Sequence, residues 1–104
     1  IFGFSYLDAN KDKIKGVPIQ GVSPSYATIS DNSYPGSRPL FIHVKKAHVG
    51  VIPGIQEYVA EFLKGSGEGG YLAAKGLIVS PKAASDKANA AVTNMTVLTA
   101  DELK

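Results

Sequence analysis

The sequence contains no cysteine and no tryptophan, and it has a single methionine among its 104 residues. The lack of cysteine excludes disulfide frameworks and cysteine-ligated metal sites, which fits an extracytoplasmic protein without requiring one. The sequence also lacks a large excess of either charge, since 11 Lys and Arg against 9 Asp and Glu give a formal net charge of +2. No basic cluster exceeds the pair Lys45-Lys46. This balance argues against partners such as nucleic acid or an anionic membrane.

A long apolar run is missing too, because no stretch approaches the about 20 residues that a membrane-spanning helix requires. There is no signal-peptide pattern and no initiating methionine, and Ile1 lies inside a predicted strand, so we expect a processed or excised piece. What is present is ordinary for a globular protein, with 44% hydrophobic and 19% charged residues. A chain of 104 residues is expected to form one domain or part of one.

The strongest strand signal lies in residues 33–46, which begin with turn-forming residues that include Pro35 and Gly36. Residues 40–44 are then apolar at almost every position and rich in β-forming side chains. A strand that is apolar on both faces is typical of a sheet with helices packed on either side. The pattern therefore predicts an α/β fold, in which residues 1–7 and 16–19 form further short strands.

The residues after this strand predict an amphipathic helix from Gly54 to Leu63. Its apolar stripe repeats at helical spacing and comprises Ile55, Tyr58, Val59, Phe62 and Leu63. Gly65 is placed to end this helix. Shorter helices are predicted over residues 23–31, 71–75 and 80–93, with the Ser-Pro pairs at 23–24 and 80–81 as N-cap and first helical residue.

Two blocks of the sequence resemble the late part of the phosphate-binding proteins of bacterial ABC transporters. The first is Tyr34-Pro-x-Ser-Arg-Pro-Leu-Phe-Ile-His-Val, followed by the helix Gly54-Ile-Gln-Glu-Tyr-Val-Ala-Glu-Phe-Leu63. The second comprises the opening Ile1-Phe-Gly-Phe-Ser-Tyr-Leu and Asn10-Lys-Asp-Lys-Ile-Lys-Gly-Val-Pro-Ile19, which is similar to the segment that precedes the first block in that family. The resemblance covers essentially the whole chain, and the order and spacing of these pieces support it.

The resemblance implies the C-terminal part of a type II periplasmic-binding-protein-like fold, with a mixed sheet and flanking helices. Residues 1–36 would end the second lobe, and residues 37–104 would cross the hinge and return into the first lobe. The implied function is the phosphate-binding component of an ABC-type phosphate importer, which performs no catalysis and needs no cofactor. Its ligand would be inorganic phosphate, its partner a permease in the membrane, and its location the periplasm or outer surface of a bacterial cell.

Ser37 and Arg38, at the implied hinge crossing, are the candidate ligand-binding residues. Arginine offers bidentate donors to an oxyanion, and serine offers one more. A surface ion pair or a hinge contact is the alternative role for Arg38, and the two Ser-Pro helix starts are further candidate anion sites. In the resembling family the principal phosphate ligands lie on earlier segments that match nothing here. No family ligand therefore transfers to a residue of this chain.

Neither a metal site nor a catalytic site is predicted. His43 and His48 are the only histidines, and two histidines without a carboxylate at helical spacing make a poor zinc site. We expect His43 in the buried strand and His48 on the following loop, as core or rim residues. No set of nucleophile, base and electrophile is recognisable, so an enzyme has the least support.

The alternative function is a free-standing α/β interaction or regulatory module. A piece of this fold that lacks half of each lobe would expose sheet edges and apolar faces. A homodimer would cover these surfaces, and sedimentation at several concentrations discriminates this hypothesis from a compact monomer.

Overall fold

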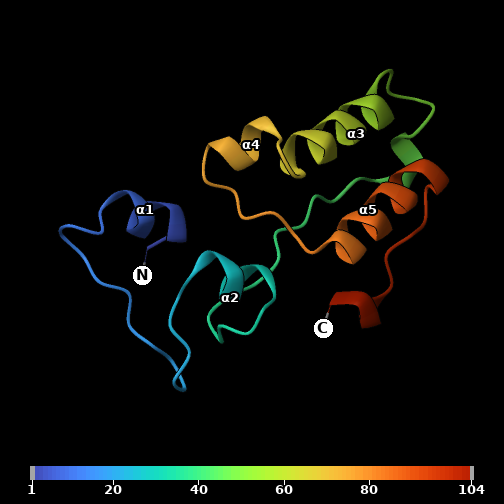
Figure 1. Cartoon of the computed structure of the whole chain (residues 1–104). Helices are drawn as coiled ribbons and strands as arrows, with labels where there is room; N and C mark the ends of the chain where they lie inside the picture. The colour runs from blue at the N-terminus through green and yellow to red at the C-terminus, as the bar shows by residue number, and fades with distance from the viewer. Residues whose placement is uncertain (1, 104) are drawn as a thin grey trace.

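The structure, a computed structural model, describes residues 2–103 and is built from helices joined by long irregular segments (Figure 1). Helix α3 packs against both α4 and α5, while α1 and α2 lie beside the segment that joins α4 to α5 (Figure 1). No helix among the described residues is long and apolar enough to cross a membrane. The helices are α1 (Phe4–Ala9), α2 (Tyr26–Ser30), η1 (Lys46–His48), α3 (Ile55–Ser66), α4 (Tyr71–Ala74), α5 (Lys82–Asn94) and η2 (Ala100–Leu103).

The helix predicted after residue 54 is confirmed as α3, and it holds the core. Gly54 precedes it with a φ of 77°, in the left-handed region that glycine adopts without strain. Val59 is 8% exposed and is the buried hydrophobic residue of the described part of the chain. Tyr58 was expected in the same apolar stripe, yet it is 71% exposed. Among the described helices, α4 and α5 are the ones that pack closely on α3, and the buried stripe is narrower than the sequence pattern suggests.

Gly65 does not end α3, because the helix continues to Ser66. Gly65 is buried, and a Cβ atom built on it would lie 2.4 Å from Cζ of Tyr71 in α4. Only a residue without a side chain lets the tyrosine ring approach the helix so closely. The glycine therefore serves the packing of α4 on α3 rather than helix termination.

The predicted α/β fold with a mixed sheet is wrong. Between residues 2 and 103 the β pairing is limited to one isolated antiparallel bridge, in which Ile19 and Val22 each donate to the other's carbonyl at 3.0 Å. The predicted strand at residues 1–7 is largely helix α1, and Ile1 lies outside the described residues. Residues 40–44 form no strand and are exposed. β-Forming side chains favour a strand only where neighbouring strands complete its hydrogen bonds, and residues 2–103 supply no such neighbour.

Helix α2 begins later than predicted, because Ser25 rather than Ser23 caps it. The Thr28 N–H donates to Ser25 Oγ at 3.2 Å, and the Ser25 N–H donates to Thr28 Oγ1 at 2.9 Å. Two terminal N–H groups are satisfied reciprocally in this capping box. Helix α5 likewise begins at Lys82 with Pro81 as its N-cap, one residue beyond the predicted N-cap. The predicted helix at residues 71–75 is confirmed as α4.

Candidate anion-binding site

The candidate residue Ser37 lies at the end of a turn that follows α2. Asp31 Oδ1 accepts from the Ser33 N–H at 2.9 Å, and the Tyr34 N–H donates to the Thr28 carbonyl at 2.8 Å. The Ser37 N–H then donates to the Tyr34 carbonyl at 2.9 Å. These local bonds hold the backbone up to Ser37 and set the direction in which the chain leaves α2.

The Ser37 side chain is already engaged within this turn. Its Oγ donates to the Tyr34 carbonyl at 2.7 Å, and the side chain is half-buried. A hydroxyl has one proton to donate, so Ser37 gives it to an anion only after this bond breaks. In the observed arrangement Ser37 is therefore not a free anion donor.

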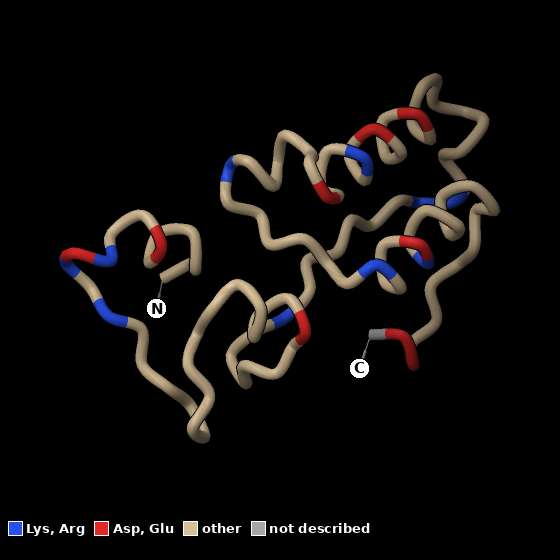
Figure 2. Tube along the Cα trace, viewed as in Figure 1, with Lys and Arg blue, Asp and Glu red and all other residues tan. Residues whose placement is uncertain are grey.

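Arg38, in contrast, is exposed and has no hydrogen bond or ion pair with any residue in the range 2–103. Its guanidinium keeps all five N–H donors free for an external oxyanion. Figure 2 shows Lys and Arg distributed over several segments of the chain rather than gathered in one place. An exposed cation of this kind holds an anion weakly, because water and salt screen the attraction. Ser37 and Arg38 are adjacent in the sequence, but in the structure only Arg38 has side-chain donors free to bind an anion.

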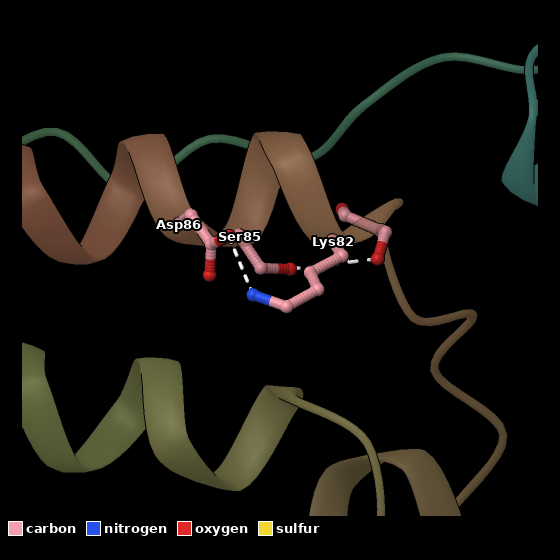
Figure 3. Close-up of polar contacts among 4 residues, drawn as sticks. Lys82, Ser85 and Asp86 are labelled. Atoms are coloured by element: carbon pink, nitrogen blue, oxygen red, sulfur yellow. Dashed lines mark hydrogen bonds and ion pairs between the residues drawn. The ribbon is translucent and has the colours of Figure 1, made fainter.

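The second candidate anion site, at the start of α5, is occupied by its own side chains (Figure 3). Lys82 Nζ lies 2.6 Å from Oδ2 of Asp86 one turn further along the helix. Ser85 Oγ donates to the Ser80 carbonyl at 3.4 Å, and the Ser85 N–H donates to the Pro81 carbonyl at 3.1 Å. The Asp86 carboxylate both holds the nearby cation and repels an incoming anion, so this helix start is poorly suited to bind phosphate.

The Ser-Pro pair at residues 23–24 does not form an anion site either. Helix α2 starts at Tyr26, and the hydroxyl of Ser25 already accepts from a terminal N–H of the helix. The Ser23 carbonyl accepts from Thr28 Oγ1 at 2.8 Å, so this residue acts through its backbone. The capping box thus uses donors that an anion would need.

The two histidines lie on the chain between α2 and α3. His43 is exposed, in contrast to its predicted burial in a strand, and its ring centroid is 6.2 Å from that of Phe41. His48 is half-buried at the end of η1. Among the described residues, no group of three or more His, Cys, Asp or Glu side chains is placed to hold a metal ion.

One polar cluster was missed by sequence reasoning. Lys87 Nζ on α5 lies 2.6 Å from Oε1 of Glu102 in η2, while the Thr99 N–H donates to Glu102 Oε2 at 3.0 Å. The hydrogen bond from Lys87, followed by those from Thr99, lowers the pKa of Glu102 to about 2. The spacing Thr99-x-x-Glu102 is that of a capping box and indicates the local half of this cluster. Nothing in the sequence indicates Lys87 as the distant half.

Comparison with known proteins finds that the chain is similar to part of the phosphate-binding protein PstS. It is 39% identical over 82 residues to the phosphate-binding protein PstS of Staphylococcus aureus strain MRSA252, an alignment that covers 70% of this chain and 25% of that protein. The PstS proteins of strains USA300 and COL are 38% identical over the same length and coverage. The chain thus spans about a quarter of the length of the curated relatives it matches. No protein-family model matches the chain. No solved structure matches it.

Proposed function

We propose that this chain is part of the phosphate-binding component of an ABC-type phosphate importer. The observation that supports this function is the 39% identity to PstS, a protein named for phosphate binding. We infer non-covalent capture of inorganic phosphate rather than catalysis, in line with the binding-protein name of these relatives. Within such a protein we assign residues 1–36 to the end of the second lobe, and residues 37–104 to the hinge crossing and the return into the first lobe.

In this proposal Arg38 is the residue of the chain that contacts the anion. Its free guanidinium can direct two parallel N–H groups at two oxygens of one phosphate. Ser37 becomes a second donor when its hydroxyl turns away from the Tyr34 carbonyl, to which it is bonded at 2.7 Å. An exposed pair of this type contributes on the order of 1 kcal/mol or less, so tight capture requires further donors and the exclusion of water. The chain then acts as hinge and scaffold with one anion contact.

The proposed function also implies a location and a partner. A component that delivers phosphate to an importer works outside the cytoplasm, in the periplasm or at the cell surface of a bacterium, and docks on the permease in the membrane. Affinity capture with the solubilised permease of the same organism tests the partner. Retention of the permease by the binding protein, and its loss in a buffer without phosphate, is the expected result.

The decisive experiment measures phosphate binding by the product of the gene that encodes this sequence. We expect saturable binding of radiolabelled phosphate in equilibrium dialysis, with little competition from sulfate. The Arg38→Gln variant should bind a few-fold more weakly, whereas Lys75→Gln, a matched change of an exposed cation after α4, should bind normally. A gene product that does not bind phosphate at all would exclude the proposal.

The isolated 104-residue chain offers a second readout. We expect its amide NMR fingerprint to ignore phosphate and sulfate alike, because Arg38 is exposed and Ser37 is bonded internally. Phosphate-specific shifts at these two amides would instead show that the hinge segment binds the anion by itself.

A further inference from the structure

Two side chains of α2 hold the backbone of Val79, which lies far along the sequence. The Val79 N–H donates to Tyr26 Oη at 3.2 Å, and Ser30 Oγ donates to the Val79 carbonyl at 2.8 Å. Tyr26 and Ser30 are separated by one helical turn, so their side chains lie on the same face of α2. Both backbone groups of Val79 are thus satisfied by side chains 53 and 49 positions earlier in the sequence. We call these three residues the α2 clasp.

The α2 clasp fastens α2 to the segment that joins α4 to α5, and α1 meets the same segment. Gly76 in this segment has a φ of 98°, and a Cβ atom built on it would lie 2.6 Å from Cβ of Ser5 in α1. This close approach is independent of the clasp, so the first part of the chain is held on the segment at two places. Both contacts join residues of this chain, and neither depends on surface that the rest of a longer protein would cover.

Helix α2 in turn fixes the backbone that leads to Arg38. The Tyr34 N–H donates to the Thr28 carbonyl at 2.8 Å, and the Ser37 N–H donates to the Tyr34 carbonyl at 2.9 Å. Tyr34 Oη also donates to the Val17 carbonyl at 3.2 Å, which ties this turn to the segment before α2. These bonds connect the helix to the residue directly before Arg38. A displacement of α2 therefore carries the backbone of Arg38 with it.

We propose that Tyr26 and Ser30 are positioning residues for Arg38 in anion capture. This role rests on the proposed function, in which the guanidinium of Arg38 contacts the anion. The hydroxyls of Tyr26 and Ser30 engage Val79, and through this clasp they set where Arg38 lies relative to the group formed by α3, α4 and α5. An anion contact adds to other donors only where it is held in place beforehand, because ordering it on binding would cost free energy.

A purely structural role of the clasp is the alternative, and the two roles differ in one measurable respect. A positioning residue acts through Arg38, so its loss has no further effect once the guanidinium has been removed. A structural residue changes binding to the same extent whether the guanidinium is present or not. Combining each clasp variant with a variant of Arg38 separates these two cases.

Equilibrium dialysis of phosphate against the product of the gene that encodes this sequence tests the positioning role. We expect Tyr26→Phe and Ser30→Ala each to weaken binding by about two- to threefold, within the few-fold loss that Arg38→Gln itself gives. In the Arg38→Gln background both changes should have no further effect. Ser30→Thr keeps the hydroxyl and should bind normally. Tyr58→Phe is the matched control, because it removes a hydroxyl from an exposed tyrosine on α3.

Hydrogen exchange of the same protein, followed by mass spectrometry, reports the state of the clasp directly. Tyr26→Phe removes the oxygen that accepts from the Val79 N–H, so peptides that cover residues 77–80 should exchange several-fold faster. Peptides from α3 should exchange as before, which shows that the variant remains folded. Tyr58→Phe should leave both sets of peptides unchanged.

The possible results separate the positioning role from the proposed function. A gene product that binds no phosphate would exclude both. Phosphate binding that Tyr26→Phe and Ser30→Ala leave unchanged, or weaken equally with and without the Arg38 guanidinium, would overturn the positioning role alone. Unchanged exchange at residues 77–80 in Tyr26→Phe would overturn it too, because the tyrosine would then not hold Val79.

Discussion

Lys87 and Glu102 form an ion pair between α5 and η2, with Nζ and Oε1 2.6 Å apart. The pair joins the last described helix to a residue 15 positions earlier in the sequence. Thr99 adds its N–H and hydroxyl to the same carboxylate, at 3.0 and 3.2 Å. Both partners are partly exposed, so we expect the pair to order the chain end rather than to stabilise the whole fold.

Replacing Lys87 by Met should release η2 from α5. The variant keeps the aliphatic length of the side chain but removes the charge that Glu102 binds. Amide hydrogen exchange at residues 99–102 should become several-fold faster, with α3 unaffected. Lys82→Met is the control, because Lys82 pairs with Asp86 at the opposite end of α5. Exchange rates that do not change in Lys87→Met would show that the ion pair does not order η2.

Acid should release η2 in a defined pH range. Hydrogen bonds from Lys87 and Thr99 lower the pKa of Glu102 from its ordinary 4.5 to about 2. A lowered pKa means that the contribution of this carboxylate is complete above pH 4.5 and disappears as the pH falls through about 2. The Thr99 amide shift, followed by NMR, should therefore titrate near the lower value. Glu102→Gln should abolish this titration, and a midpoint near the ordinary value would contradict the observed geometry.

Gly65→Ala should destabilise the α3–α4 contact. Alanine favours a helix interior by up to about 1 kcal/mol over glycine, but its Cβ would lie 2.4 Å from the Tyr71 ring. Overpacking of this type costs about 1–3 kcal/mol, so we expect a net loss of about 1 kcal/mol in urea unfolding. Gly67→Ala is the control, because its Cβ would meet its nearest neighbour at an ordinary 3.5 Å. The double variant Gly65→Ala with Tyr71→Ala no longer has the overlapping ring. It should therefore show the stabilisation that alanine gives a helix interior relative to glycine.

Ser25→Ala should weaken α2 by about 1 kcal/mol, the usual effect of removing an N-cap hydroxyl. The change removes the oxygen that accepts from the Thr28 N–H at 3.2 Å. Ser23→Ala should have little effect, because the bond that Ser23 accepts uses its backbone carbonyl. Secondary chemical shifts of residues 26–30 report the helix content of each variant. A larger loss in Ser23→Ala would support the N-cap position that the Ser-Pro pattern predicts.

The sequence predicts Ser37 and Arg38 as candidate anion-binding residues, but it does not describe the surroundings of their side chains. The resemblance at Ser37-Arg38-Pro39 predicts a hinge crossing, which stays a prediction. In the structure Arg38 has no hydrogen bond or ion pair with any residue from 2 to 103. The bond from the Ser37 hydroxyl to the Tyr34 carbonyl is a three-dimensional detail of the turn, which residue types alone do not show. Similarly, the Lys82–Asp86 pair at the start of α5 follows from helical spacing, but its effect on an anion depends on the built geometry.

The sequence by itself determined α3, α4 and α5, because helical hydrogen bonds and apolar periodicity lie within a few residues of each other. It also determined the absence of disulfides and the similarity to part of PstS. Only the tertiary structure decided the state of residues 40–44, since a strand depends on partners that are distant in sequence. The same holds for the Tyr71 ring on Gly65 and for Lys87 with Glu102, because both contacts arise only when separate helices pack together.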